Sequence, residues 1–132
     1  MAAYRFAEHG GEVELELEAD GVEGIFASAL EAFAELVSTD GEGAAVERRI
    51  ALHGDDRALL LVDWLSELVY LAEVDGFVPE RTVAFELAGN HLRARVAGRR
   101  DQPLQLVKAV TLNNLELAQE GAVWHGRVVL DV

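Results

Sequence analysis

Polar and apolar residues alternate strictly near the start of the chain. Residues 12–19 read EVELELEA, the period of two expected for a strand with one buried and one solvated face. Residues 3–9 alternate in the same way, and Gly10-Gly11 follows them as turn residues. The pattern predicts a hairpin that carries His9 and Glu12 at its tip.

Two later segments have the longer period of helices. Residues 22–37 place apolar side chains at spacings of three and four, which is typical of an amphipathic helix, and residues 39–43 (TDGEG) are expected to end it. A second helix is predicted over residues 57–73, with Asp55 or Asp56 as its N-cap. It is apolar nearly all round except at Asp63 and Glu67, so we expect it to be the central buried helix. Its apolar run is too short to span a membrane.

The remaining segments are predicted to be strands, at residues 46–53, 81–88, 91–97, 104–112, 114–118 and 122–131. Gly89-Asn90 suits a tight turn between the predicted strands 81–88 and 91–97. Residues 104–112 are apolar on both faces and are expected to be covered on both sides. The order of elements predicts an α+β fold, with mixed or antiparallel sheets packed with two main helices. We expect a single domain over residues 1–132.

Composition narrows the classes of site. The chain has no cysteine, so a disulfide framework, a thiolate metal site and a cysteine nucleophile are excluded. It also lacks a recognisable secretory signal, and we expect it to be cytoplasmic. The net charge is −13, of which residues 1–50 carry −9. An acidic surface repels phosphate backbones and favours cations or a basic protein partner, although it also serves solubility alone.

Lys108 is the single lysine of a chain that otherwise uses ten arginines. The predicted strand places it on one face with Leu106, Val110 and Leu112, where an ammonium group is costly unless it is paired or near water. One lysine in such a place suggests a need for a compact point charge rather than a planar fork. The alternative is that Lys108 lies at a strand end and extends its ammonium group to solvent.

The sequence ends in Asp131-Val132, which places a side-chain carboxylate within one residue of a main-chain carboxylate. Such hard oxygen donors repel each other unless a cation joins them; the alternative is a solvated terminus. The four histidines show no metal-ligand spacing, and no nucleophile motif or phosphate loop occurs. A basic group at residues 93–100 is expected to be a solvated strand and loop.

Three segments together resemble the archease family. They are residues 8–12 (EHGGE), residues 61–71 leading into 75–77, and residues 107–111 (VKAVT) followed by Asp131-Val132. The likeness covers nearly the whole chain in order. Two departures stand out: the N-terminal motif reads His9-Gly10-Gly11-Glu12 where the family has His-Thr-Ala-Asp, and Leu112-Asn113 follows Thr111 where many members have tyrosine and histidine or a small polar residue.

The resemblance implies an accessory protein of the RtcB-type RNA ligase, which seals tRNA halves. Such proteins promote guanylylation of the ligase and its multiple turnover in tRNA splicing or RNA repair, and are not enzymes themselves. The resemblance also implies a divalent metal, calcium before magnesium, held by Glu12, Asp131 and the carboxylate of Val132. His9 would lie beside this metal, and Lys108 would be the functional cation near it. We expect no membrane association and no stable binding of nucleic acid by the chain itself.

Two other classes of function fit the same residues. The first is an acidic adaptor or chaperone-like modulator of another RNA-modifying enzyme, such as a tRNA methyltransferase, which would need no metal. The second is a hydrolase with Glu12 and Asp131 as paired carboxylates, for which the sequence supplies no substrate pocket or nucleophile.

Overall fold

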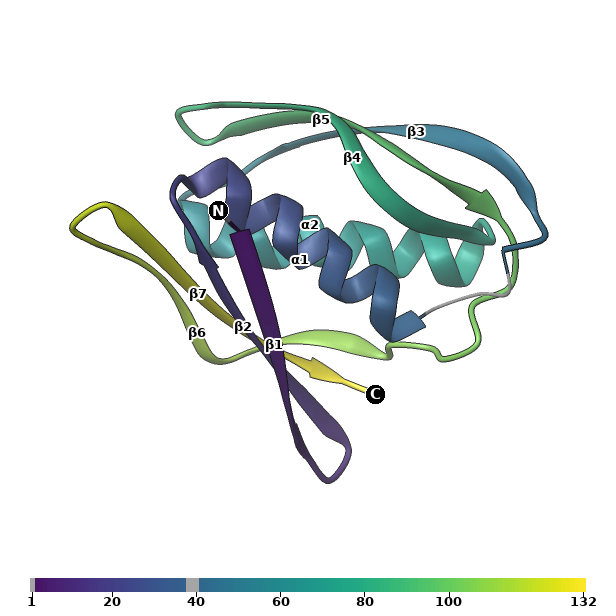
Figure 1. Cartoon of the computed structure of the whole chain (residues 1–132), viewed down its shortest axis with the longest axis horizontal. Helices are drawn as coiled ribbons and strands as arrows, with labels where there is room; N and C mark the ends of the chain where they lie inside the picture. The colour runs from purple at the N-terminus through teal and green to yellow at the C-terminus, as the bar shows by residue number, and fades with distance from the viewer. Residues whose placement is uncertain (1, 38–40) are drawn as a thin grey trace.

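The computed structural model describes residues 2–37 and 41–132, and its strands and helices alternate in blocks along the chain (Figure 1). The elements are β1 (Ala2–His9), β2 (Glu12–Ala19), α1 (Val22–Val37), β3 (Ala44–His53), α2 (Arg57–Val74), β4 (Phe77–Ala88), β5 (His91–Arg100), β6 (Ala109–Glu120) and β7 (Val123–Asp131). The predicted α+β fold with two main helices is confirmed.

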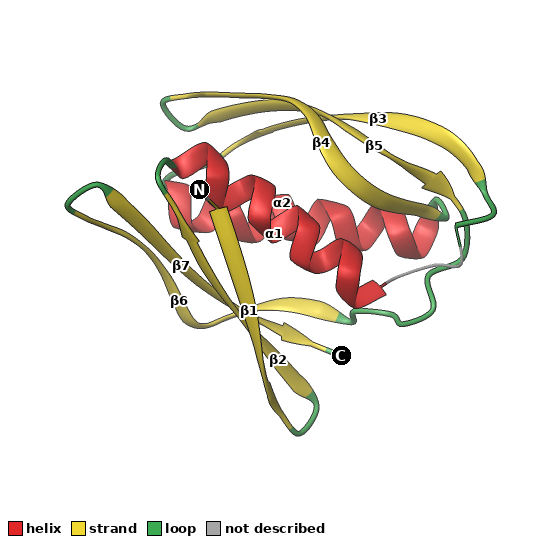
Figure 2. Cartoon of the chain, in the orientation of Figure 1, coloured by secondary structure: helices red, strands yellow, loops and turns green. Residues whose placement is uncertain are grey.

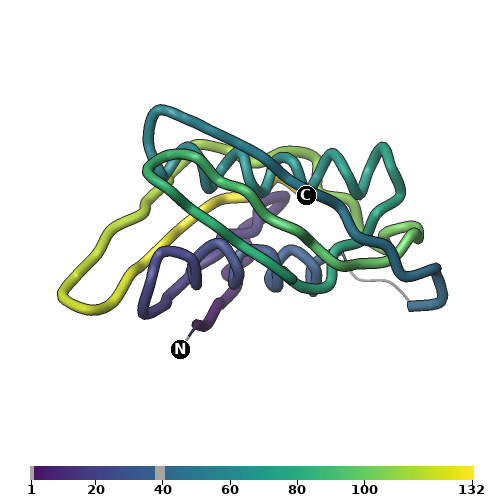
Figure 3. The backbone as a smooth tube through the Cα atoms, turned by 90° about the horizontal axis from the view of Figure 1, so that it is seen from above, coloured from purple at the N-terminus to yellow at the C-terminus, as the bar shows by residue number. Residues whose placement is uncertain are grey.

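The two helices lie between two antiparallel sheets. One sheet has four strands in the order β1-β2-β7-β6, and the other has three in the order β3-β5-β4. Helix α1 contacts β1, β2 and β4, whereas α2 contacts β3, β4 and β6. Figure 2 shows the helices in red between the two yellow sheets, and Figure 3 shows the three-stranded sheet crossing them obliquely. Each sheet therefore keeps one face for the core and turns the other outward.

The core is centred on aromatic side chains that join the helices to β4. The rings of Phe26 and Phe85 lie 5.5 Å apart, and those of Trp64 and Phe85 lie 5.8 Å apart. Trp64 is fully buried, and its Nε1–H donates a hydrogen bond of 3.0 Å to the main-chain oxygen of Phe26. This bond satisfies a donor that burial would otherwise leave costly, and it fixes α2 against α1.

Helix α2 begins at Arg57, as predicted, and Asp56 is its N-cap. The carboxylate of Asp56 accepts a hydrogen bond of 2.8 Å from the main-chain N–H of Leu59, which satisfies one of the free donors of the first turn. Tyr70 is 52% exposed, so the helix has a wider solvated side than its sequence predicts. Of the predicted end of α1, Thr39 and Asp40 lie outside the described residues. No helix within residues 2–37 and 41–132 combines the length and apolarity needed to cross a bilayer.

Strand β4 begins earlier than predicted, at Phe77 instead of residue 81, and it contains Pro79. A proline is tolerated there because β4 is an edge strand and its pairing with β5 shifts register between Pro79 and Arg81. The predicted turn at Gly89 is confirmed, with a φ of 60° that glycine adopts without strain.

The predicted strand over residues 104–112 is wrong for residues 104–108, whereas residues 109–112 lie in β6 together with the separately predicted strand 114–118. Residues 101–108 form a loop, and β6 begins at Ala109. The main-chain N–H groups of Leu104 and Gln105 both donate to the oxygen of Val37, so the loop is bonded to the end of α1 instead of to a strand. Of its apolar side chains Val107 is buried, whereas Leu104 is 73% exposed.

Candidate functional site

Five residues that the sequence singled out lie at one end of the four-stranded sheet. They are His9, Glu12, Lys108, Asp131 and Val132, and we call them the terminal cluster. His9 lies opposite Glu12 in the β1-β2 hairpin, and Glu12 lies opposite Asp131 in the pairing of β2 with β7. The start of β2 therefore lies beside the end of β7, and in Figure 1 the tip of the hairpin projects beyond the C-terminus.

Main-chain hydrogen bonds hold this end of the sheet together. The N–H of Val132 donates to the oxygen of Gly11 at 2.9 Å, which continues the pairing of β7 past its last residue. The N–H of Lys108 donates to the oxygen of Asp131 at 2.7 Å, so the loop before β6 joins the cluster through its backbone. Residues almost 120 positions apart in sequence thus become neighbours without any side-chain contact being needed.

The acidic side chains of the cluster lie on the outer face of the sheet. Along β2, Val13 and Leu15 are buried against the helices, whereas Glu12 is half-buried and has the opposite orientation because successive side chains alternate. Residues directly opposite each other in an antiparallel pair share a face, so His9, Glu12 and Asp131 lie on this outer face together.

The outer face is hollowed next to Glu12. A cavity of about 310 Å³ is lined by His9, Glu12, Glu14, Asn113, Asn114 and Val129. Asn113 and Asn114 were not predicted to belong to the site. They reach it because the pairing of β6 with β7 is interrupted between Thr111 and Glu116, and Asn114 has a φ of 55°. Two consecutive asparagines within an apolar strand pattern are a signal for such a bulge.

The donor chemistry of the cluster suits a hard cation. Two carboxylates directly opposite each other on paired strands repel, and a cation with oxygen ligands would remove that repulsion. Within the described residues, no three histidine, aspartate or glutamate side chains form a group able to hold a metal. The resemblance adds the main-chain carboxylate of Val132 to Glu12 and Asp131 as metal ligands, and this ligand set stays a prediction.

Lys108 is exposed, and it precedes β6 instead of lying within a strand covered on both sides. The expectation that it shares a buried face with Leu106 and Leu112 is wrong, because those leucines are 54% and 62% exposed. Within the part of the chain that the structure describes, no ion pair engages Lys108. Its ammonium group is thus available to a partner, and exposed leucines flank it on both sides in sequence.

The comparisons with known proteins agree in family and in fold. The Archease protein family matches this chain over residues 4–132. The protein archease of Methanosarcina mazei is 32% identical over 139 residues, covering 98% of this chain and 95% of the relative. The archease of Methanothermobacter thermautotrophicus is 30% identical, with 80% of each chain covered.

Two solved structures resemble the whole chain. The solution structure of Methanobacterium thermoautotrophicum protein 1598 has a TM-score of 0.71 at 26% identity and covers 98% of both chains. The crystal structure of a Thermotoga maritima protein, described as an archease and possible chaperone, has a TM-score of 0.67 at 21% identity. It covers 96% of this chain and 94% of that one, which shows that the two share a fold.

Proposed function

Because the chain belongs to the archease family, we propose that it is a metal-binding accessory protein of an RtcB-type RNA ligase. It would promote the GTP-dependent guanylylation of that ligase and its multiple turnover, in cytoplasmic tRNA splicing or RNA repair. The observation that supports the proposal is the convergence of the terminal cluster, because β2, β7 and the loop before β6 bring its five residues to one end of a sheet.

The carboxylates of Glu12, Asp131 and Val132 would hold the metal, with His9 beside them. Calcium fits this set better than magnesium, because calcium accepts irregular oxygen geometry whereas magnesium demands a near-ideal octahedron. When bound, the metal would neutralise the opposed carboxylates and supply a positive centre next to Lys108. Glu12 is longer than the aspartate of the family motif, and its extra methylene suits a site that is half-buried at a sheet end.

The surroundings of Lys108 suit contact with a protein. Leu104, Leu106 and Leu112 are exposed on the same stretch of chain, and exposed leucines near one another commonly mark protein contact sites. The hydrogen bonds to Val37 and Asp131 hold this stretch at both ends. We therefore expect the ligase to cover these leucines and to receive Lys108 as a point charge near its guanylylation site.

The proposal is tested by mixing the chain with its cognate ligase, GTP and calcium and following covalent guanylylation. Lys108→Ala and Asp131→Asn are expected to abolish stimulation and to leave the fold intact. Lys108→Arg separates a point charge from a planar fork, and it is expected to restore little activity. Glu18→Gln is the matched control, because Glu18 lies on the same face of β2 at the other end of the strand, opposite His125. No stimulation by the unmodified chain at any stoichiometry would reject the proposal.

A second candidate is an adaptor or chaperone-like modulator of another RNA-modifying enzyme, such as a tRNA methyltransferase. The exposed leucines around Lys108 favour it as much as they favour the ligase, since neither contact depends on metal. Calcium titration calorimetry separates the two. Stimulation of a methyltransferase by a chain that binds no calcium would replace the first proposal by the second.

A further inference from the structure

The positive charge of the chain is concentrated in its three-stranded sheet. Strands β3, β4 and β5 hold seven arginines and three glutamates, a net charge of +4. The rest of the chain holds four basic and 21 acidic residues, a net charge of −17. The helices separate this sheet from the four-stranded one (Figure 1), so the basic region and the terminal cluster lie on opposite sides of the molecule.

Three arginines stand together on the outer face of this sheet. Arg49 lies opposite Arg95 in the pairing of β3 with β5, and Arg93 is two residues from Arg95 on the same face. All three are exposed. Like charges directly opposite each other on paired strands destabilise a sheet, so the Arg49–Arg95 pair costs stability unless an anion binds there, whereas Arg93 lies opposite Glu86 of β4. We call Arg49, Arg93 and Arg95 the arginine face.

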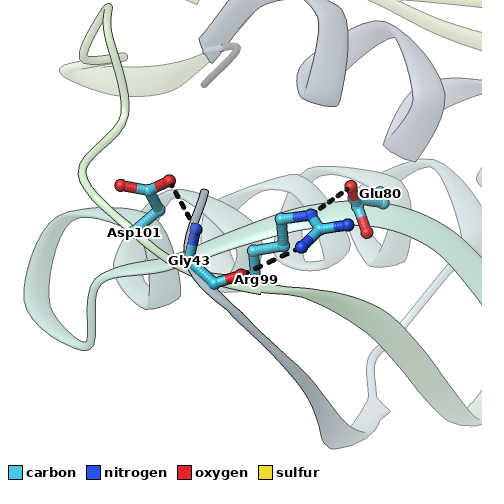
Figure 4. Close-up of polar contacts among 4 residues, drawn as sticks. All are labelled: Gly43, Glu80, Arg99 and Asp101. Carbon is cyan, nitrogen blue, oxygen red and sulfur yellow. Dashed lines mark hydrogen bonds and ion pairs between the residues drawn. The ribbon is translucent and has the colours of Figure 1, made fainter. Parts of the chain in front are cut away.

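The side chains of the arginine face make few polar interactions within the protein. Within the described residues, no ion pair or hydrogen bond engages the side chains of Arg49 and Arg93, and Arg95 has one distant contact of 3.7 Å to Glu47. Arg99 differs, as Figure 4 shows: its Nε donates to Glu80 at 3.1 Å and its Nη1 to the oxygen of Gly43 at 2.9 Å. Arg99 therefore has a structural role, whereas the arginine face has free guanidinium donors.

The surface between these arginines is hollowed. A cavity of about 590 Å³ is lined by Arg49, Arg93 and Arg95, by the exposed Glu86, which lies opposite Arg93 on β4, and by the apolar residues Ile50, Ala51, Ala84, Phe85 and Ala94. At one end of the same face, the rings of His53 and His91 lie 5.7 Å apart across the two strands, and both residues are exposed. Guanidinium forks match the oxygens of phosphate groups, and exposed imidazole and guanidinium planes are surfaces on which bases stack.

We propose that the arginine face binds a segment of single-stranded RNA, with phosphates on the guanidinium groups and a base on the paired histidine rings. The histidine pair favours RNA over an acidic peptide, because a peptide of carboxylates makes no use of ring faces. The acidic remainder of the chain favours a flexible strand over a duplex, because a rigid polyanion would extend beyond the basic sheet. The proposal is independent of metal and of the ligase, because the terminal cluster lies on the other sheet.

The sequence led to the opposite expectation, that the chain would not bind nucleic acid stably by itself. The four arginines within residues 93–100 lie close together in one predicted strand and the loop after it, and they look like a solvated segment. Folding adds Arg49 from β3 and places His53 beside His91, while it removes Arg99 from the set. The binding surface therefore comes from two strands that are separated by a helix and a third strand in sequence.

The test is fluorescence anisotropy of a labelled single-stranded RNA of about 12 nucleotides, with the whole chain, in chelator and at about 50 mM salt. The triple variant R49Q/R93Q/R95Q is expected to lose at least about tenfold in affinity. The slope of log affinity against log salt concentration should become shallower by about two, because each of the three lost phosphate contacts accounts for about 0.7. The double variant R5Q/R127Q removes two arginines from the four-stranded sheet and should stay within about twofold of the unmodified chain. The double variant R49Q/R95Q removes the same charge from the arginine face and should lose more affinity than R5Q/R127Q.

The histidine pair has its own readout. The double variant H53A/H91A is expected to weaken RNA binding about fivefold or more and to leave the binding of inorganic polyphosphate unchanged, because polyphosphate has no bases to stack. Four results would overturn the proposal: no RNA binding at low salt, equal losses in R49Q/R95Q and R5Q/R127Q, polyglutamate binding as tightly as RNA, or self-association that R49Q/R93Q/R95Q abolishes. The thermal midpoint verifies folding, and relief of the Arg49–Arg95 repulsion should keep that of R49Q/R93Q/R95Q at or above the original.

Discussion

Replacing Glu12 by glutamine is expected to change the stability of the protein in opposite directions without and with calcium. In chelator the carboxylates of Glu12 and Asp131 face each other directly across β2 and β7, with Cβ atoms about 5 Å apart in such pairs. Two unit charges at about 5.5 Å interact by about 0.8 kcal/mol in water and about 3 kcal/mol at an effective dielectric constant of 20. Because both residues are half-buried, we expect Glu12→Gln to stabilise the metal-free protein by about 1 kcal/mol.

Differential scanning calorimetry measures the change in melting temperature that these energies produce. At about 2.1 cal/mol/K per residue, a chain of 132 residues has an unfolding entropy of about 0.28 kcal/mol/K. Glu12→Gln should therefore melt about 3–4 °C above the unmodified chain in chelator. With calcium at about 100 times its dissociation constant, the unmodified chain should gain about 2.7 kcal/mol, or about 10 °C, and the variant should gain little.

The order of the two melting temperatures is thus expected to reverse on addition of calcium. Glu18→Gln again serves as the control, because Glu18 faces His125 rather than another carboxylate and its replacement should give no gain in chelator. A Glu12→Gln protein that melts below the unmodified chain in chelator, or that gains as much from calcium, would refute the reasoning about opposed carboxylates.

Two further predictions concern the sheets. Gly98→Ala should destabilise the protein by about 3 kcal/mol, because a Cβ at Gly98 would lie 2.2 Å from the main-chain oxygen of Val78 and 2.8 Å from the ring of Phe77. Chemical denaturation measures the loss of stability, and a loss below about 1 kcal/mol would contradict the close approach. Burial, and then the hydrogen bond to the Glu35 carboxylate and its charge, raise the pKa of Tyr4. Its contribution to stability is complete below the unfolded pKa of about 10 and is lost as pH rises through the folded pKa. Tyr4→Phe should therefore reduce the alkaline loss of stability, and an absorbance titration should lose the phenol whose pKa is raised.

Local patterns predicted most of the elements because those patterns report a single buried face. The glutamates of residues 12–19 alternate with core residues, and the structure places Val13 and Leu15 inside. The same reasoning gave a wrong prediction for residues 104–108. Their leucines look like core residues, yet the backbone of Leu104 bonds to the end of α1, and no local pattern encodes that tertiary contact.

The candidate site was predictable in its members but not in its full extent. His9, Glu12 and Asp131 were named from turn and terminus arguments together with family resemblance, and the pairing of β1, β2 and β7 brings them together. Asn113 and Asn114 were missed because they reach the cavity through an irregularity in β6. The arginine face was missed for a related reason, since Arg49 and Arg95 become neighbours through the register of two distant strands.

The central position of β7 has a consequence for how the protein comes into being. β7 is made after all the other strands, yet it lies between β2 and β6. Until it is synthesised, β1 and β2 form only a two-stranded hairpin packed against α1. Closing the sheet requires pairing across more than 100 residues, a slow kind of contact to form. Glu12 and Asp131 therefore meet late, so a nascent or half-folded chain would lack the terminal cluster and, under the proposed function, would not compete with finished molecules for the ligase.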